Sequence, residues 1–249
     1  MKKNQIAINT LVYLEDISKG KTQYEFIKMI KKLGLKAIEI RREYIKDTDI
    51  ELSKIKDLSR DYGIEVYYSV PDTLFKNGEL KKNLDKYIEE TKAMGAVKVK
   101  FNIGEFNGFT KDSAAVLKGI AADKEILITI ENDQTDLSGK ISSIKKFLEA
   151  CSENNINIFY TLDIGNWCWT GEDPIKNALE LKEYTKYIHL KDIKFEDGKP
   201  CTAYLDEGTI KWREVLSIFS SDIPVALEYP CGDDPEKVIK KEIEKMLLV

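Results

Sequence analysis

The feature that most constrains the fold of this chain is a regular alternation of short strand-like runs with amphipathic segments. Most successive runs start about 30 residues apart, which is the length of one strand–helix unit. Eight such units predict an α/β fold, a single (β/α)8 TIM barrel that occupies residues 1–249 as one domain. The eight predicted strands are Ile6–Thr10, Lys36–Arg41, Ile64–Ser69, Val97–Asn102, Ile126–Glu131, Ile158–Asp163, Tyr187–Asp192 and Val225–Pro230.

The segments between the predicted strands have the apolar spacing of helices. Tyr24–Gly34 carries one apolar stripe, and its last residue, a glycine, can end the helix. Leu80–Gly95 and Ile141–Cys151 follow the same pattern, and Ser138 lies in a polar stretch suited to starting the latter helix. An open doubly wound sheet is the alternative fold, but the turn after the first strand lacks the glycine pattern that such sheets often carry.

The connection between the seventh and eighth predicted strands is irregular in length. It contains Glu196-Asp197-Gly198, which predicts a hairpin turn.

Composition argues against several classes of partner. The chain has 39 basic and 43 acidic residues, a net charge of −4 and no basic patch, so we expect no nucleic-acid partner. Two lysines near the start are not followed by a long apolar stretch, so we expect no signal peptide, no membrane partner and a cytoplasmic location. None of the four cysteines forms a CxxC pair, which argues against a zinc ribbon and a disulfide framework.

Four ligand-type residues lie at or near the C-terminal ends of four consecutive predicted strands, where a barrel carries its catalytic groups. They are Glu131, Asp163, His189, the only histidine in the chain, and Glu228. Taken singly, each has an ordinary alternative as a salt-bridged carboxylate or a core histidine. Together, three carboxylates and one imidazole suit one divalent ion, Mn²⁺, Mg²⁺, Co²⁺ or Zn²⁺. Such an ion would relieve the repulsion among carboxylates that are otherwise uncompensated.

Polar residues with inward parity on other strands are candidates for substrate binding. Arg41 shares the parity of Glu39 and either binds a substrate hydroxyl or phosphate or pairs with Glu39. Lys100 and Asn102 alternate with apolar residues on the fourth predicted strand, and we expect them to reach the substrate. Lys191 has the parity of His189 and is a further candidate.

Two more groups near the predicted strand ends have possible roles. Asp192 could orient the site from behind its ligands. Trp167, with Trp169 and Tyr13, could form an aromatic floor beneath a sugar, and the alternative is ordinary loop packing.

Several local motifs resemble those of the xylose isomerase-like TIM barrels, a family of sugar isomerases, sugar-phosphate epimerases and related lyases. The motifs are IEND around Glu131, LDIGN around Asp163, IHLKD around His189, EGTIKW at Glu207–Trp212 and ALEYP around Glu228. The resemblance implies that the four strand-end residues bind one metal ion and that Glu131 and Glu228 exchange the substrate proton. It further implies a sugar or sugar-phosphate substrate that reacts through a metal-stabilised enediolate, with Glu39 near it, and a possible homo-oligomer.

Two departures from the family pattern leave the reaction open. Asn166 and Asp133 stand where relatives often carry a histidine, and an asparagine can bind a hydroxyl but cannot shuttle a proton. A metal-dependent dehydratase of an inosose-like or dehydroshikimate-like substrate and a non-catalytic metabolite-binding barrel are the alternatives. The DNA-repair endonucleases of the family use a multi-zinc site rich in histidine, which a single histidine and a net negative charge argue against.

Overall fold

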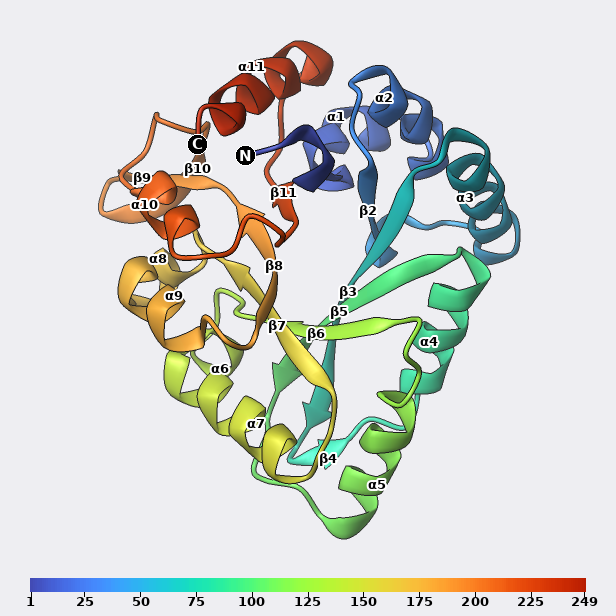
Figure 1. The fold of residues 1–249 in the computed structure, drawn as a ribbon, viewed down its shortest axis with the longest axis vertical. Coiled ribbons are helices and arrows are strands. Elements are labelled where there is room, and N and C mark those ends of the chain that lie inside the picture. Colours follow the sequence, from blue (N-terminus) through green and yellow to red (C-terminus); the bar gives the residue numbers. More distant parts are fainter.

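The structure, a computed structural model, describes residues 1–249. Eight parallel strands close into a barrel in the order β1-β2-β3-β5-β6-β7-β8-β11, and β11 pairs with β1 (Figure 1). This confirms the predicted (β/α)8 TIM barrel. The barrel strands are β1 (Ile6–Asn9), β2 (Ala37–Arg41), β3 (Glu65–Lys76), β5 (Ala96–Gly104), β6 (Leu127–Glu131), β7 (Ile158–Asp163), β8 (Thr185–Leu190) and β11 (Val225–Leu227).

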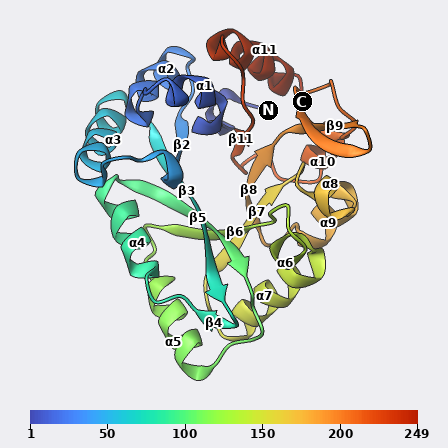
Figure 2. The same cartoon turned by 180° about the vertical axis from the view of Figure 1, so that it is seen from behind.

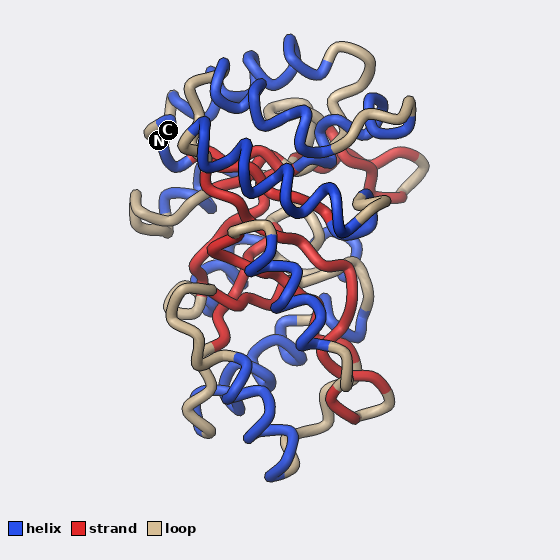
Figure 3. The backbone as a smooth tube through the Cα atoms, turned by 90° about the vertical axis from the view of Figure 1, so that its right-hand side faces the viewer, coloured by secondary structure: helices blue, strands red, loops and turns tan.

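The helices surround the barrel on its outside (Figure 2). Figure 3 shows the two chain termini side by side, and the Met1 amino group donates to the Val249 carbonyl. None of the helices has both the length and the apolar composition needed to cross a membrane. The helices are α1 (Leu14–Ser18), α2 (Ile27–Lys32), α3 (Thr48–Tyr62), α4 (Leu84–Ala93), α5 (Lys111–Ile120), α6 (Asp136–Gly139), α7 (Ile141–Glu153), α8 (Trp167–Thr170), α9 (Pro174–Leu181), α10 (Trp212–Ser217) and α11 (Pro235–Leu247).

Helix boundaries follow local capping chemistry. Gly34 follows α2 with a φ of +73°, so a glycine ends this helix as predicted. The prediction for Ser138 is wrong, because this residue lies in α6 and its hydroxyl accepts from the Gly104 amide at 2.9 Å. Lys140 stands at the start of α7 and provides no side-chain cap.

Strands β3 and β5 run further than the sequence predicts. β3 continues into a hairpin with β4 (Glu79–Leu80), so the helix expected from Leu80 begins only at Leu84. The turn is Asn77-Gly78, with φ values of 52° and 77°, a pair that favours tight hairpins. This Asn-Gly pair is a hairpin signal in the sequence itself.

The irregular connection after β8 is a hairpin of β9 (Asp192–Glu196) and β10 (Lys199–Ala203), paired antiparallel. Asp197 and Gly198 form its turn with φ values of 49° and 75°, which confirms the predicted turn.

Two layers of side chains fill the barrel near its axis. The lower layer is an apolar cluster of Ala7, Ala37, Tyr67, Tyr187 and Ala226. The residue two positions after each of these five is polar, and four of those polar residues contact one another: Asn9, Glu39, His189 and Glu228. Because side chains two apart point the same way along a strand, the polar layer lies directly above the apolar one, toward the C-terminal ends.

A candidate metal and acid–base site

The four predicted metal ligands meet at the C-terminal mouth of the barrel. Glu131 and Asp163 are the last residues of β6 and β7, His189 lies in β8, and Glu228 follows β11 directly. All four are buried, and one ligand atom from each lies within 4.8 Å of the others. The parallel strands thus bring together residues that are far apart in the sequence.

The imidazole of His189 lies between carboxylates on both of its nitrogen atoms. Nδ1 is 2.5 Å from Glu131 Oε1 and 3.3 Å from Glu228 Oε2, and Nε2 is 2.8 Å from Glu39 Oε2. Burial opposes protonation, but the three carboxylates outweigh it and raise the pKa of His189 well above its usual value. Glu39 lies beside the far nitrogen, where a carboxylate can orient a metal-bound histidine, although this contact lacks the geometry of a hydrogen bond.

Glu39 is itself held in place by two donors. The Asn9 side-chain amide donates to its Oε2 at 2.8 Å, and the Tyr187 hydroxyl donates to the same atom at 3.1 Å. The fully buried carboxylate therefore has a fixed position behind the histidine.

Two lysines bind the carboxylates of the site. Lys100 Nζ lies 2.5 Å from Glu131 Oε2, and Lys191 Nζ lies 2.7 Å from Asp163 Oδ2 and 2.9 Å from Glu228 Oε2. The expectation of uncompensated carboxylates is therefore wrong, because Lys100 and Lys191 pair with the acids of the site.

Arg41 adds a third cation. Its guanidinium lies 2.8 Å from Glu228 Oε1 and 2.7 Å from Glu43 Oε1. The alternative of a Glu39–Arg41 ion pair is not what the structure shows, because Glu39 turns toward His189.

The carboxylates of the site differ in proton affinity. Burial alone would raise the pKa of Glu131, but Lys100 and His189 lower it to about 2. The pKa of Glu228 is also well below its usual value, because His189 and Lys191 outweigh burial. Burial raises the pKa of Asp163 to about 7, although Lys191 opposes the shift. Glu131 and Glu228 are therefore ionised at neutral pH, whereas Asp163 is the carboxyl most readily protonated.

The donor set fits a divalent cation. Three carboxylates and an imidazole are the ligands that Mn²⁺, Mg²⁺, Co²⁺ or Zn²⁺ accept. Asp163 Oδ2 is buried without a hydrogen bond of good geometry and lies 2.7 Å from the Lys191 ammonium. That ammonium lies between Asp163 and Glu228, so a metal ion held by both carboxylates would replace it.

The polar residues predicted to bind substrate lie in different surroundings. Asn102 on β5 has a buried side-chain oxygen without a hydrogen-bond partner. Asn166 bridges two loops, because its Nδ2 donates to the Asn132 carbonyl at 2.9 Å and its Oδ1 accepts from Gln134 at 3.1 Å. Asp133 accepts from the amide and hydroxyl of Thr135 in a local turn.

Two of the three aromatic residues proposed to form a floor beneath a sugar are buried in the hydrophobic core. Trp167 is fully buried in the main hydrophobic core, and Tyr13 stacks on Phe26 with ring centroids 4.0 Å apart. Trp169 is half-buried. The alternative of ordinary loop packing describes Trp167 and Tyr13.

Asp192 organises the loop that follows β10 and forms no hydrogen bond to the four candidate ligands. Its carboxylate accepts from the amides of Asp206, Gly208 and Ile210 at 3.0–3.1 Å. A Cβ at Gly208 would lie 2.2 Å from Asp192 Oδ1, so this approach requires glycine.

Three residues of the site escaped the sequence reasoning. Asn9 contacts Glu39 and Glu228, and Tyr187 contacts Glu39. Asn132 accepts from the Asp163 amide at 2.9 Å and donates to its carbonyl at 2.8 Å. Asn9 is a polar residue next to the end of the first predicted strand, a signal like the one that identified the four ligands.

Comparison with known proteins identifies the family. The model of the xylose isomerase-like TIM barrel matches residues 27–248. The chain belongs to the xylose isomerase-like TIM barrel family. Several solved structures share the fold at low sequence identity. A xylose isomerase domain containing protein from Salmonella typhimurium LT2 superposes with a TM-score of 0.72 at 14% identity, covering 100% of this chain and 97% of that one.

Two further solved structures superpose over nearly the whole length. D-allulose 3-epimerase from Methylomonas sp. has a TM-score of 0.72 at 18% identity, with 100% and 98% of the two chains covered. A probable 3-DHS dehydratase from Bacillus anthracis has a TM-score of 0.69 at 17% identity, with 98% of each covered.

One curated sequence is also similar over part of its length. An adenine deaminase from Petrotoga mobilis is 28% identical over 136 residues, which is 52% of this chain and 23% of that protein. The chain thus spans about a quarter of the curated relative that it matches.

Proposed function

We propose that this chain is a divalent-metal-dependent isomerase or epimerase of ketoses or related hydroxy-ketones. The observation that carries the proposal is the meeting of Glu131, Asp163, His189 and Glu228, from four consecutive barrel strands, within 4.8 Å. A site of this composition suits a substrate with two adjacent oxygens next to an acidic C–H bond.

In this proposal the four side chains hold one ion, with His189 turned by Glu39 so that Nδ1 faces the other ligands. When bound, a divalent ion would polarise the substrate carbonyl and stabilise negative charge on its oxygen. The ordered Asn9 and Tyr187 contacts to Glu39 support the required ring orientation.

Glu131 and Glu228 are the proposed acid–base pair. One carboxylate accepts the proton from the carbon next to the carbonyl, and the other returns a proton to the opposite face or to the neighbouring carbon. The first outcome is epimerisation, and the second is aldose–ketose isomerisation. Both glutamates are ionised in the free protein, as a proton acceptor must be.

The cations of the site are proposed substrate contacts. Lys100, Lys191 and Arg41 now bind carboxylates, and hydroxyl or phosphate oxygens of a substrate can compete for their donors. Movement of Lys100 away from Glu131 would raise the proton affinity of that carboxylate and make it a better base. Asn102, whose buried oxygen lacks a partner, is a further candidate contact.

The test is a panel of ketoses assayed with Mn²⁺, Mg²⁺ and Co²⁺ in deuterated water. The proposal predicts that deuterium enters at the carbon next to the carbonyl and that Glu131→Gln and Glu228→Gln each abolish this exchange. Glu244→Gln, on the exposed face of α11, is the matched control and leaves exchange unchanged. Exchange that persists in Glu228→Gln would rule out Glu228 as one of the two proton-transferring groups.

A dehydratase would use the same proton removal and then expel hydroxide. If the protein forms a chromophoric product from dehydroshikimate and catalyses no deuterium exchange into ketoses, the dehydratase is the function that the data support. Absence of both activities and of stoichiometric metal would instead favour a metabolite-binding barrel.

A further inference from the structure

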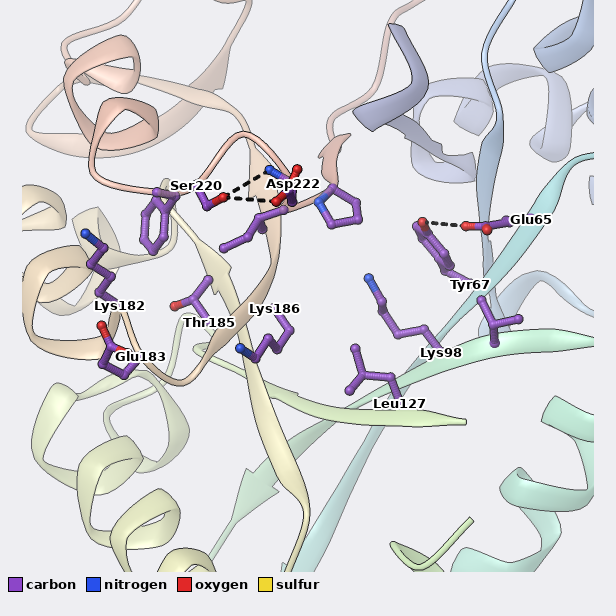
Figure 4. A pocket seen from close by; sticks show the side chains of 14 residues that line it. Glu65, Tyr67, Lys98, Leu127, Lys182, Glu183, Thr185, Lys186, Ser220 and Asp222 are labelled. Carbon is purple, nitrogen blue, oxygen red and sulfur yellow. Dashed lines mark hydrogen bonds between the residues drawn. The ribbon is translucent and has the colours of Figure 1, made fainter. Parts of the chain in front are cut away.

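A cavity lies at the end of the barrel opposite the candidate metal site. Its volume is about 600 Å³, and Figure 4 shows the side chains that line it. Glu65, Leu127 and Thr185 are the first residues of β3, β6 and β8, so the cavity opens at the N-terminal mouth. Family barrels carry their chemistry at the other mouth, and the proposed function makes no use of this one.

Lys98 on β5 lies at the base of this cavity and has no partner. Its residue surface is 4% exposed, and no hydrogen bond or ion pair involves its ammonium group. Nζ instead lies over two aromatic rings, 4.1 Å from the centre of Tyr67 and 3.8 Å from that of Tyr187. The rings attract a cation by their faces but leave its N–H donors unused.

A buried ammonium without a counter-ion is costly. Burial lowers the pKa of Lys98 to about 7, and the carboxylates of Glu39 and Glu65 only partly oppose this. The group therefore gains most from an anion that enters the cavity and accepts from its free N–H bonds.

The rim of the cavity carries two lysines and three acidic side chains. Lys182 and Lys186 both line it, both are exposed, and neither forms an ion pair. Glu65 accepts from the Tyr67 hydroxyl at 3.1 Å, and Asp222 is 3.4 Å from the Ser220 hydroxyl. Glu183 is exposed at the rim and is the third acidic residue of the cavity, with Glu65 and Asp222. None of these three carboxylates lies within 4.0 Å of a lysine nitrogen of the cavity.

We propose that this cavity binds the carboxylate or phosphate group of a small anionic molecule, with Lys98 as the buried cation and Lys182 and Lys186 as cations at the rim. This site is separate from the proposed catalytic site, and the test of one proposal does not depend on the result for the other.

The experiment is calorimetric titration of the full chain with inorganic phosphate and with acetate at low ionic strength. We expect saturable binding to the native protein. Lys98→Met should raise the dissociation constant about tenfold or more, because a charge-assisted hydrogen bond is lost. The double variant Lys182→Met/Lys186→Met, which changes only exposed side chains, should weaken binding severalfold.

Two controls separate this cavity from other anion sites. Lys28→Met on α2 and Lys237→Met on α11 each remove an exposed, unpaired lysine that does not line the cavity, and neither should change the dissociation constant. Absence of saturable binding, native-like binding by Lys98→Met, or loss of binding in either control variant would overturn the proposal.

A pH series with sulfate, whose charge is constant over the range, gives an independent readout. Lys98 is faced by Glu65 and Tyr67 from β3, Tyr187 from β8 and Glu39 from β2. Because the ammonium must be protonated to hold an anion, affinity should fall between about pH 6.5 and about pH 9 in the native protein. A fall of the same size in Lys98→Met would also overturn the proposal.

Discussion

The Lys191 ammonium is the cation that a metal ion would replace, and its removal should therefore be rescued by metal. Lys191→Met leaves Asp163 and Glu228 buried beside each other without the ammonium that lies 2.7 and 2.9 Å away. Breaking a buried ion pair costs about 3–5 kcal/mol. For a domain of this size each kcal/mol lowers the melting temperature by about 2–4 °C, so the metal-free variant should melt roughly 6–20 °C below the native protein.

The assay is thermal unfolding with chelator and then with saturating Mn²⁺. A dication compensates both carboxylates and no longer competes with the ammonium, so Mn²⁺ should stabilise Lys191→Met more than the native protein. Lys194→Met is the matched control, because that lysine pairs with Glu196 on the exposed hairpin and should show no measurable change. A metal-free variant as stable as the native protein, or one that Mn²⁺ fails to stabilise, would show that Lys191 does not occupy the place of a metal ion.

Three further predictions concern stability away from the metal ligands. Gly208→Ala should cost about 1–3 kcal/mol in urea unfolding, because the added Cβ would meet Asp192 Oδ1 at 2.2 Å; an unchanged midpoint would contradict the anchor role of Asp192. Glu242→Ala should cost about 1–3 kcal/mol or more by the same assay, because the buried Leu205 amide and Tyr229 hydroxyl lose their acceptor; a neutral effect would show that water replaces it. Lys98 has a pKa of about 7 in the folded protein, below its value in the unfolded chain. The buried charge therefore destabilises the folded protein at low pH, and this cost decreases as the pH rises from 7 toward 10. In anion-free buffer Lys98→Met should thus be more stable than the native protein near pH 6.5, and this advantage should shrink by pH 9.5; an advantage independent of pH would contradict the assigned shift.

The sequence predicted the barrel because its signals are local and repeated. Each strand is a short run of β-branched and apolar residues, and the polar residue at its end marks the same mouth on every strand. Glu131, Asp163 and Glu228 could be found in this way. Closure of the barrel then places them together, whatever the details of the loops.

The charge balance of the site could not be read in the same way. Whether Lys100 and Lys191 point at the carboxylates or at a substrate depends on side-chain rotamers and on the stagger between strands, which periodicity does not determine. The same limit applies to Trp167, where the sequence gives an aromatic residue near the mouth but not the direction in which it packs. The β3–β4 hairpin, in contrast, was predictable from Asn77-Gly78.

We propose that Glu131, Asp163, His189 and Glu228 hold one divalent ion. Anomalous diffraction at the manganese edge from crystals grown with Mn²⁺ would locate this ion. We expect a single strong peak about 2.0–2.3 Å from a carboxylate oxygen of each acid and from His189 Nδ1, with the Lys191 ammonium moved away. No peak at this mouth, with Lys191 still bridging Asp163 and Glu228, would contradict the proposal.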